Sequence, residues 1–227
     1  MGELLELVRA NGWSAAAGRV GSSLQRRLRD RVTARRLGAP GFRAGRGPRI
    51  LGLNGMRIGE DFHAGDALWL EAVLRYAGVS FTPELMIGPH ARLSDNVHIA
   101  CLGRISIGAH LLCGSRVLIS DHAHGRYQGA GGSDPGTPPA HRPLHSAAPV
   151  TIGQNVWLGD GVAVLAGAAI GDGCVIGANA VVTGAIPPGT IAVGAPAQPI
   201  RRWSETEQSW VKLARTGERF EPSDLVD

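Results

Sequence analysis

The feature that most constrains this chain is a repeat of six residues in its second half. From residue 146 the sequence divides into SAAPVT, IGQNVW, LGDGVA, VLAGAA, IGDGCV, IGANAV and VTGAIP. A large aliphatic residue recurs at the first position of the units, as Ile152, Leu158, Val164, Ile170, Ile176 and Val182. The fifth position is small or β-branched, as Val150, Val156, Val162, Ala168, Cys174, Ala180 and Ile186. Because a fixed period decides the whole architecture, it takes precedence over local patterns.

A period of six matches neither the alternation of a strand nor the 3.6-residue period of a helix. It matches a coil with short strands on flat faces, in which the first residue of each unit points inward and the fifth fills a corner. The same register occurs upstream at Ile87, Leu93, Ile99, Ile107, Cys113 and Ile119, with two extra residues between Ile99 and Ile107. The pattern therefore predicts stacked coils with parallel ladders, one continuous core and a small corner insertion.

The composition agrees with an all-β core. The 227 residues include 33 glycines and 14 prolines but only 5% aromatics, which disfavours a helical architecture. Three scattered cysteines, Cys101, Cys113 and Cys174, form neither a disulfide framework nor a thiolate zinc site and predict a reducing compartment. We recognise no signal peptide and no bilayer-spanning run, so we expect a cytoplasmic protein.

Charge and helix signals divide the chain into three parts. Residues 1–49 are expected to be a basic helical segment, residues 50–202 the β-helix, and residues 203–227 a C-terminal helix and tail. Residues 1–50 carry a net charge of +8, which leaves −4 for the remainder. The basic segment fits either a weak contact with an anionic membrane or glycan, or a solvated helix packed on the prism. No nucleic-acid partner is expected. The sequence SETE at residues 204–207 is a capping-box pattern that predicts a short helix over the last coil.

Two stretches interrupt the repeat. Residues 125–145, rich in glycine, proline and polar residues, predict a loop extending from a corner. Residues 64–84 alternate in character and predict a β excursion.

The repeats and their interruptions resemble the hexapeptide-repeat acyltransferases. The resemblance spans residues 50–202 and is carried by the run IGQNVWLGDG to GAPAQPI and by the DHAH sequence at residues 121–124. The branch it resembles is that of the sugar and polysaccharide O-acetyltransferases similar to maltose and galactoside acetyltransferases. The resemblance implies a left-handed parallel β-helix of triangular section. It also implies acetyl-CoA as donor, a sugar or glycan acceptor, and a homotrimer with active sites between subunits.

Two histidines, His122 and His124, lie one residue apart where the loop begins. Continuing the register from Ile119 predicts that Ala123 points into the prism and that both imidazoles point outward. Ungapped comparison places His124 on the catalytic histidine of the resembling acetyltransferases, so we favour His124 over His122 as the general base. A neutral imidazole takes the proton of a sugar hydroxyl as its oxygen attacks the thioester, then returns it to the thiolate.

Asp121 has two open interpretations: it orients an imidazole, or it caps the backbone of its own turn. A metal site is a further alternative, because γ-class carbonic anhydrases use the same prism with three histidines on zinc, and His98 and His110 lie on neighbouring coils. The spacing of His122 and His124 does not match that family, so we expect no metal.

The resemblance also implies substrate-binding residues. Trp157 is expected to be exposed, either beside the catalytic histidine of an adjacent subunit in the acceptor pocket or packed at the subunit interface. The implied coenzyme residues include Trp157, with Gly159 and Asp160 near the thiol, Ala178 and Thr183 along the arm, and Arg201 and Arg202 near the phosphates. Two positions depart from the family pattern: Gly184 replaces a frequent lysine and Gln198 an arginine. Arg201 and Arg202 also fit plain solvated surface.

Taken together, the residues and the resemblance predict an acetyl-CoA-dependent O-acetyltransferase acting on a sugar hydroxyl in lipopolysaccharide, capsule or exopolysaccharide biosynthesis. A serine or xenobiotic acetyltransferase, a metal hydratase and a non-catalytic scaffold remain as alternatives.

Overall fold

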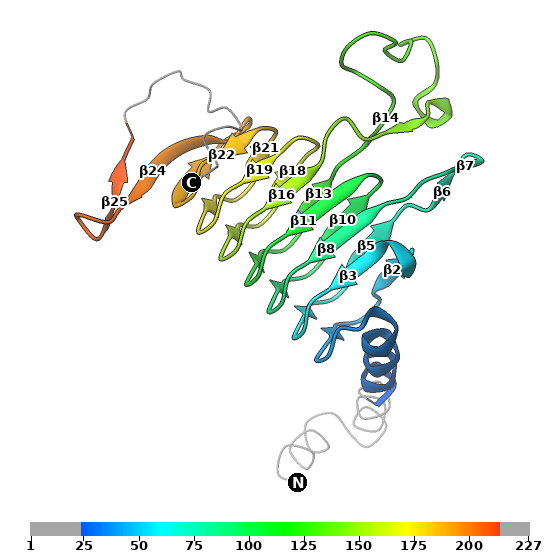
Figure 1. Cartoon of the computed structure of the whole chain (residues 1–227), viewed down its shortest axis with the longest axis horizontal. Helices are drawn as coiled ribbons and strands as arrows, with labels where there is room; N and C mark the ends of the chain where they lie inside the picture. The colour runs from blue at the N-terminus through cyan, green and yellow to red at the C-terminus, as the bar shows by residue number, and fades with distance from the viewer. Residues whose placement is uncertain (1–23, 214–227) are drawn as a thin grey trace, which may run out of the picture.

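The computed structural model describes residues 24–213, which form a prism of stacked coils preceded by one helix (Figure 1). Each coil contributes short strands to three sheets, and the strands of successive coils pair in parallel. The predicted parallel β-helix is thus confirmed. It closes around a main core that runs the length of the prism.

Along the chain, the strands of each coil lie in turn in sheet A, sheet B and sheet C. Sheet A contains β1 (Arg43–Ala44), β4 (His63–Ala64), β9 (Arg92–Leu93), β12 (Leu112–Cys113), β17 (Trp157–Leu158), β20 (Val175–Ile176) and β23 (Thr190–Val193). Sheet B contains β2 (Arg49–Leu51), β5 (Trp69–Ala72), β10 (His98–Cys101), β13 (Leu118–Ser120), β18 (Ala163–Val164) and β21 (Val181–Val182). Sheet C contains β3 (Met56–Ile58), β8 (Glu84–Ile87), β11 (Arg104–Ile107), β16 (Val150–Ile152), β19 (Ala169–Ile170) and β22 (Ala185–Ile186). A 3-10 turn, η1 (Leu53–Gly55), joins β2 to β3.

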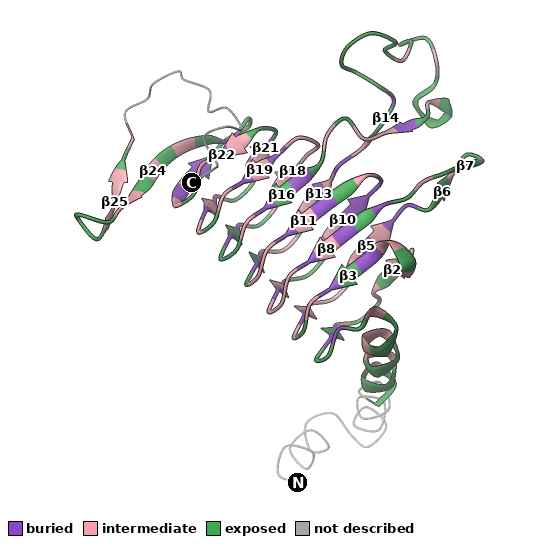
Figure 2. Cartoon of the chain, viewed as in Figure 1, coloured by how far each residue is buried: buried purple, intermediate pink, exposed green. Residues whose placement is uncertain are grey.

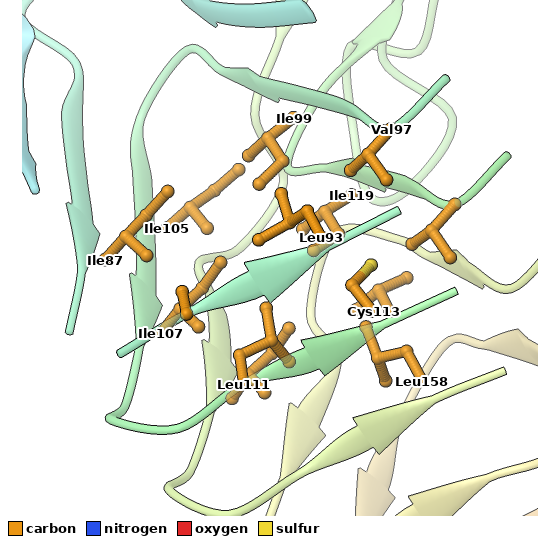
Figure 3. Packing of buried hydrophobic residues seen from close by; sticks show 14 of the residues in the cluster. Ile87, Leu93, Val97, Ile99, Ile105, Ile107, Leu111, Cys113, Ile119 and Leu158 are labelled. Carbon is orange, nitrogen blue, oxygen red and sulfur yellow. The ribbon is translucent and has the colours of Figure 1, made fainter. Parts of the chain in front are cut away.

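The six-residue register predicts the core correctly through most of the prism. All first-position residues from Ile87 to Val182 that the pattern identified are at most 6% exposed. The fifth-position residues from Val150 to Ile186 are at most 2% exposed. Figure 3 shows first-position residues of successive coils gathered in the interior, among them Ile87, Leu93, Ile99, Ile107, Cys113, Ile119 and Leu158. The repeat therefore specifies which residues are inside, because each coil rests on an equivalent one.

The edge between sheets B and C carries the departures from regular coils. The predicted excursion within residues 64–84 is a hairpin of β6 (Arg75–Tyr76) and β7 (Val79–Ser80), which project on the same side as the long loop in Figure 1. The predicted loop begins and ends in an antiparallel ribbon of β14 (Ala123–His124) and β15 (Leu144–His145), with a 3-10 turn, η2 (Pro139–His141), between them. Val73, Leu102 and Leu144 form a small second core beneath these projections.

The predicted C-terminal helix is wrong for residues 203–213. Here the chain forms an antiparallel hairpin of β24 (Gln198–Ser204) and β25 (Ser209–Lys212), in which β24 pairs with β23. The capping contact does exist, since the amide of Glu207 donates to Oγ of Ser204 at 3.2 Å, but it closes the turn of the hairpin. Pairing with the open edge of β23 overrides the local helix signal, and the hairpin covers that edge in place of a helix.

At the other end, residues 24–37 form a helix, as predicted for this part of the basic segment, but the predicted boundary at residue 50 is wrong, because β1 and the start of β2 already belong to the first coil. Ala34 and Leu37 pack on the core, and Arg29 donates to the carbonyl oxygen of Ala44 at 2.5 Å. The parts of the predicted flanks at residues 1–23 and 214–227 lie outside the described residues. No helix within residues 24–213 is long and apolar enough to cross a membrane.

Candidate active site

The residues of the DHAH sequence lie where β13 leaves sheet B at the edge shared with sheet C. The prediction that Ala123 points into the prism is wrong: Ala123 is exposed, and Asp121 is the buried residue, with 0% of its surface accessible. The hexad register ends at Ile119 because the chain turns outward two residues later to form β14. A carboxylate therefore occupies a position where an apolar side chain would be expected.

Asp121 is held by the coil before it. The amide of Leu102 donates to Oδ1 and the amide of Gly103 donates to Oδ2, each at 2.8 Å. These two amides belong to the two-residue insertion between β10 and β11. Oδ1 also lies 3.0 Å from Nδ1 of His122. Asp121 thus orients an imidazole and binds backbone amides, although these are amides of a neighbouring coil and not of its own turn.

The electrostatics of this site favour an ionised Asp121. Burial raises the pKa of its carboxyl group, but the hydrogen bonds from His122, Leu102 and Gly103 outweigh burial and leave the pKa below its usual value. An ionised carboxylate accepts a hydrogen bond from Nδ1–H of His122, which assigns the proton to Nδ1. The lone pair of Nε2 is then free to accept a proton.

His122 is the more rigidly held of the two histidines. Its side chain is 13% exposed, and besides Asp121 it lies beside Ser120, whose hydroxyl oxygen is 3.5 Å from Nδ1. The Ser120 hydroxyl also donates to the carbonyl oxygen of His122 at 3.2 Å. These contacts fix the ring on the outer side of sheet B, next to the end of β13.

His124 lies farther out, exposed on the ribbon of β14 and β15. Its partner is Tyr76 from the hairpin: the Tyr76 hydroxyl is 3.4 Å from Nδ1, and the two rings meet edge to face at 5.4 Å. The Tyr76 hydroxyl is also 3.4 Å from the carbonyl oxygen of Ala140 in the loop. The structure therefore brings together two histidines, the loop and the hairpin at one corner, with different surroundings for each imidazole.

Sequence reasoning missed Tyr76 and the residues that order the loop. Arg142 donates to the Tyr127 hydroxyl at 2.9 Å and to the carbonyl oxygen of Thr137 at 2.8 Å. The Tyr127 hydroxyl in turn donates to the carbonyl oxygen of His124. The signal that could have identified Tyr76 is its place in a hairpin turn, where Ala77 and Gly78 both have positive φ.

Trp157 is 51% exposed on β17 of sheet A, as expected for an exposed residue. Sheet A is not the sheet that ends at His122, so one subunit alone does not place Trp157 at that edge. Its register partner Leu112 on β12 is also exposed, at 49%, so that two large apolar residues lie next to each other on sheet A.

The predicted coenzyme residues fall in three places. Gly159, Asp160 and Ala178 meet at the edge between sheets A and B, where Oδ1 of Asp160 accepts the amide of Ser115 at 2.8 Å. Thr183 is exposed after β21, on the same edge as His122 but two coils along. Arg201 and Arg202 lie on β24, where a guanidinium N–H of Arg201 donates to the carbonyl oxygen of Trp210 at 3.2 Å.

The other two histidines considered for a metal are not close to one another. His98 stacks on Trp69 at 4.1 Å on sheet B, whereas His110 stacks on His90 at 4.8 Å on the edge between sheets C and A. Among residues 24–213, no three histidine, cysteine or carboxylate side chains are grouped in a way that could hold a metal ion. Nε2 of His98 is buried without a hydrogen-bond partner, and burial is the main cause that lowers its pKa.

The chain is similar to known acetyltransferases. The family model "Bacterial transferase hexapeptide (six repeats)" matches residues 149–184. WbbJ of Escherichia coli K12, assigned as a lipopolysaccharide biosynthesis O-acetyltransferase, is 41% identical over 158 residues, which cover 69% of this chain and 76% of that protein. A hexapeptide-repeat acetyltransferase of Vibrio cholerae, solved with acetyl coenzyme A, aligns over 75% of each chain with 23% identity and a TM-score of 0.48. A maltose O-acetyltransferase of Clostridium difficile aligns over 71% of this chain and 66% of that one, with 28% identity and a TM-score of 0.41.

Proposed function

The chain belongs to the bacterial hexapeptide-repeat transferases, and on this basis we propose that it transfers the acetyl group of acetyl-CoA to a sugar hydroxyl of a surface glycan. Membership follows from 41% identity with a relative of which the chain covers 76%. Membership supports acetyl-CoA as the acetyl donor and a left-handed turn of the β-helix. The choice of a glycan acceptor is supported by the assignment of that relative to lipopolysaccharide biosynthesis.

The observation that carries the mechanism is the pairing of His122 with the buried Asp121 at 3.0 Å. In our proposal Nε2 of His122 takes the proton of the acceptor hydroxyl while its oxygen bonds to the thioester carbonyl carbon. The carbon–sulfur bond then breaks, and the imidazolium returns the proton to the departing thiolate sulfur. General-base catalysis of this kind contributes about 10²- to 10⁴-fold to the rate.

Asp121 has a positioning role in this mechanism. Its charge stabilises the imidazolium that forms during the reaction, and its contact with Nδ1 keeps Nε2 available. The amides of Leu102 and Gly103 already donate to Asp121, so they hold the base in place and do not bind the oxyanion. Donors for the oxyanion must therefore come from another part of the site.

His124 and Tyr76 are assigned to the acceptor side of the site. Both side chains lie at the mouth of the loop, and the edge-to-face contact orients the exposed imidazole of His124. Imidazole nitrogens and hydroxyl groups of this kind donate and accept hydrogen bonds with sugar hydroxyls. We rank His122 above His124 as the base because only His122 has a buried carboxylate on its Nδ1.

The remaining binding residues require a second subunit in this proposal. Trp157 lies on sheet A, away from the edge that ends at His122, so sheet A of a neighbouring copy would supply the wall of the acceptor pocket. A homotrimer with Trp157 of one copy facing His122 of another is the arrangement we propose. In the same arrangement the coenzyme lies between copies, in contact with Gly159, Asp160, Ala178, Thr183, Arg201 and Arg202.

The direct test is release of free thiol from acetyl-CoA in the presence of candidate acceptors. We expect release above the hydrolytic background with oligosaccharides or nucleotide sugars, and background release with serine or chloramphenicol. A His110→Asn variant serves as the control for histidine substitutions at the site. His110 is exposed on another edge, and its backbone is left-handed, a conformation that asparagine tolerates. Thiol release with serine or chloramphenicol, and with no glycan, would show that the acceptor is not a glycan. Binding of stoichiometric zinc without binding of acetyl-CoA would instead favour a hydratase, and neither binding nor turnover would favour a scaffold.

A further inference from the structure

The helix at residues 24–37 exposes an apolar stripe on the side that faces away from the prism. Leu24, Leu28 and Val32 are 68%, 63% and 44% exposed, and their spacing of four residues places them on one side of the helix. Figure 2 shows exposed residues along the outer side of this helix and partly buried residues toward the first coil. Exposed aliphatic side chains in a continuous row are uncommon on a monomeric surface and indicate an interaction site.

The same exposed side is strongly basic. Arg27, Arg31, Arg35 and Arg36 are all exposed, and no carboxylate is among the exposed residues of this helix. The one acidic residue of the helix, Asp30, is partly buried and forms an ion pair with Arg29 at 2.6 Å. Guanidinium groups therefore alternate with aliphatic side chains over about three helical turns.

A cavity adjoins this helix and not the histidine corner. It has a volume of about 730 Å³ and lies between the helix and the first coil. Its basic lining residues are Arg26, Arg27, Arg31, Arg43 and His63, and its one carboxylate is the ion-paired Asp30. A cavity with this lining favours an anionic group such as a phosphate ester.

We propose that the helix at residues 24–37 lies on an anionic membrane surface. Leu24, Leu28 and Val32 enter the boundary between headgroups and acyl chains, while the arginines and the basic cavity bind lipid phosphates. Interleaved basic and aliphatic residues on one side of a helix are the composition of interfacial membrane helices. The arginines alone would fit any polyanion, and the aliphatic residues alone would fit any apolar partner. Only the two together indicate a membrane surface.

Charge argues against a second copy of the chain as the occupant. Symmetric contact through this side would place the four exposed arginines of one copy against those of the next, with no carboxylate among the exposed residues of the described helix to neutralise them. The inference does not depend on the proposed reaction, because none of the residues of this helix and its cavity has a role in that reaction, and the helix lies at the opposite end of the prism from β24 (Figure 1).

The test is co-sedimentation of the full chain with vesicles of phosphatidylcholine alone or with added phosphatidylglycerol. We expect binding to the anionic vesicles only. Arg27→Gln/Arg31→Gln/Arg35→Gln should lower the partition coefficient about 100-fold, given the usual contribution of each arginine at an anionic surface. Leu24→Gln/Leu28→Gln/Val32→Gln should lower it at least about tenfold, since the apolar contact is lost. The matched control, Arg57→Gln/Arg104→Gln/Arg116→Gln, removes three exposed arginines elsewhere and should bind like the wild type.

Absence of binding to anionic vesicles would overturn the proposal. Undiminished binding by the leucine and valine variant would also overturn it, because the surface would then bind polyanions without insertion. A change in sedimentation mass in that variant with unchanged vesicle binding would show that the stripe is a contact between copies. If the triple variant fails to fold by circular dichroism, Leu28→Gln alone gives the same comparison at the central position.

Discussion

Nδ1 of His122 lies 3.0 Å from Oδ1 of Asp121, and this contact distinguishes two imidazoles that the sequence presents as near equivalents. His124, two residues along, has the hydroxyl of Tyr76 at 3.4 Å in place of a carboxylate. A buried carboxylate only accepts hydrogen bonds and so fixes the tautomer of the ring, whereas a tyrosine hydroxyl can donate to the ring nitrogen or accept from it. The chemistry of the corner therefore depends on how Asp121 is buried.

Replacing Asp121 with asparagine should damage both activity and stability. We expect kcat to fall about 100-fold or more, because the tautomer of His122 is no longer fixed, with little change in the KM for acetyl-CoA. The free energy of unfolding should fall by about 1–3 kcal/mol, since an amide nitrogen cannot accept the N–H of Leu102 or Gly103. Steady-state kinetics and urea denaturation measure the two effects.

Asp172→Asn is the matched control for that variant. Oδ1 of Asp172 accepts the amide of Gln154 at 2.8 Å, a contact of the same kind at an exposed corner of another edge. The kcat of the Asp172→Asn enzyme should equal that of the wild type. An Asp121→Asn enzyme with wild-type kcat would show that the carboxylate has no role in positioning the base.

The corner shows where sequence reasoning succeeds and where it stops. The register identified the inward residues up to Ile119 because every coil repeats the same packing. It failed at Ala123, since a buried Asp121 is stable only with amides that come from residues 102 and 103, 19 and 18 positions earlier. The two-residue insertion was visible in the sequence, but its function depends on which coil lies beside it.

Substitution of Trp157 should separate its two proposed roles. If it forms the acceptor pocket from a neighbouring subunit, Trp157→Ala should raise the KM for the acceptor about tenfold or more, while acetyl-CoA hydrolysis without acceptor is unchanged. Trp157→Phe should show a smaller effect, because part of the aromatic surface remains. Analytical ultracentrifugation of both variants provides the control: loss of the oligomer at unchanged acceptor KM would assign Trp157 to subunit packing alone.

Gly159 should tolerate no side chain. A Cβ at this position would lie 2.7 Å from the backbone nitrogen of Ala178 and 3.0 Å from its Cα, where only backbone could give way. Gly159→Ala should therefore lower the free energy of unfolding by about 1–3 kcal/mol. Gly184, one of the two departures from the family pattern, has open space where a Cβ would lie, with no heavy atom of the described residues within 4 Å, and its φ is not positive. Gly184→Ala should change the stability by about 0.5 kcal/mol or less, and equal destabilisation of both variants would contradict this account.

His98 should make the folded state sensitive to mild acid. Burial lowers the pKa of His98 in the folded protein, so below its usual pKa near 6.5 the unfolded chain binds a proton that the folded chain resists. Its contribution to stability is present above about pH 6.5 and is lost as the pH falls toward the lowered value. His98→Phe retains an aromatic ring against Trp69 and should lose less thermal stability than the wild type between about pH 7 and pH 5. Parallel changes in Tm for the two proteins across this range would show that another group is responsible.

The C-terminal hairpin illustrates a different limit of local patterns. Ser204 and Glu207 make the contact that a capping box requires, yet β24 and β25 on either side of it are strands. The open edge of β23 decides the outcome, because an unpaired strand at the end of the prism offers a full ladder of backbone hydrogen bonds to the segment that follows. Whether this segment forms a helix or a hairpin is thus settled by tertiary contact and not by the local pattern.

The assignment of the base is tested most directly by the rate of acetyl transfer in His122→Ala and His124→Ala, with exogenous imidazole added to each. We predict that His122→Ala loses about 10²- to 10⁴-fold in kcat and that imidazole restores part of it, while His124→Ala raises the KM for the acceptor and retains most of kcat. Full turnover by His122→Ala, together with an imidazole-rescued loss in His124→Ala, would contradict the assignment and place the base on the outer histidine.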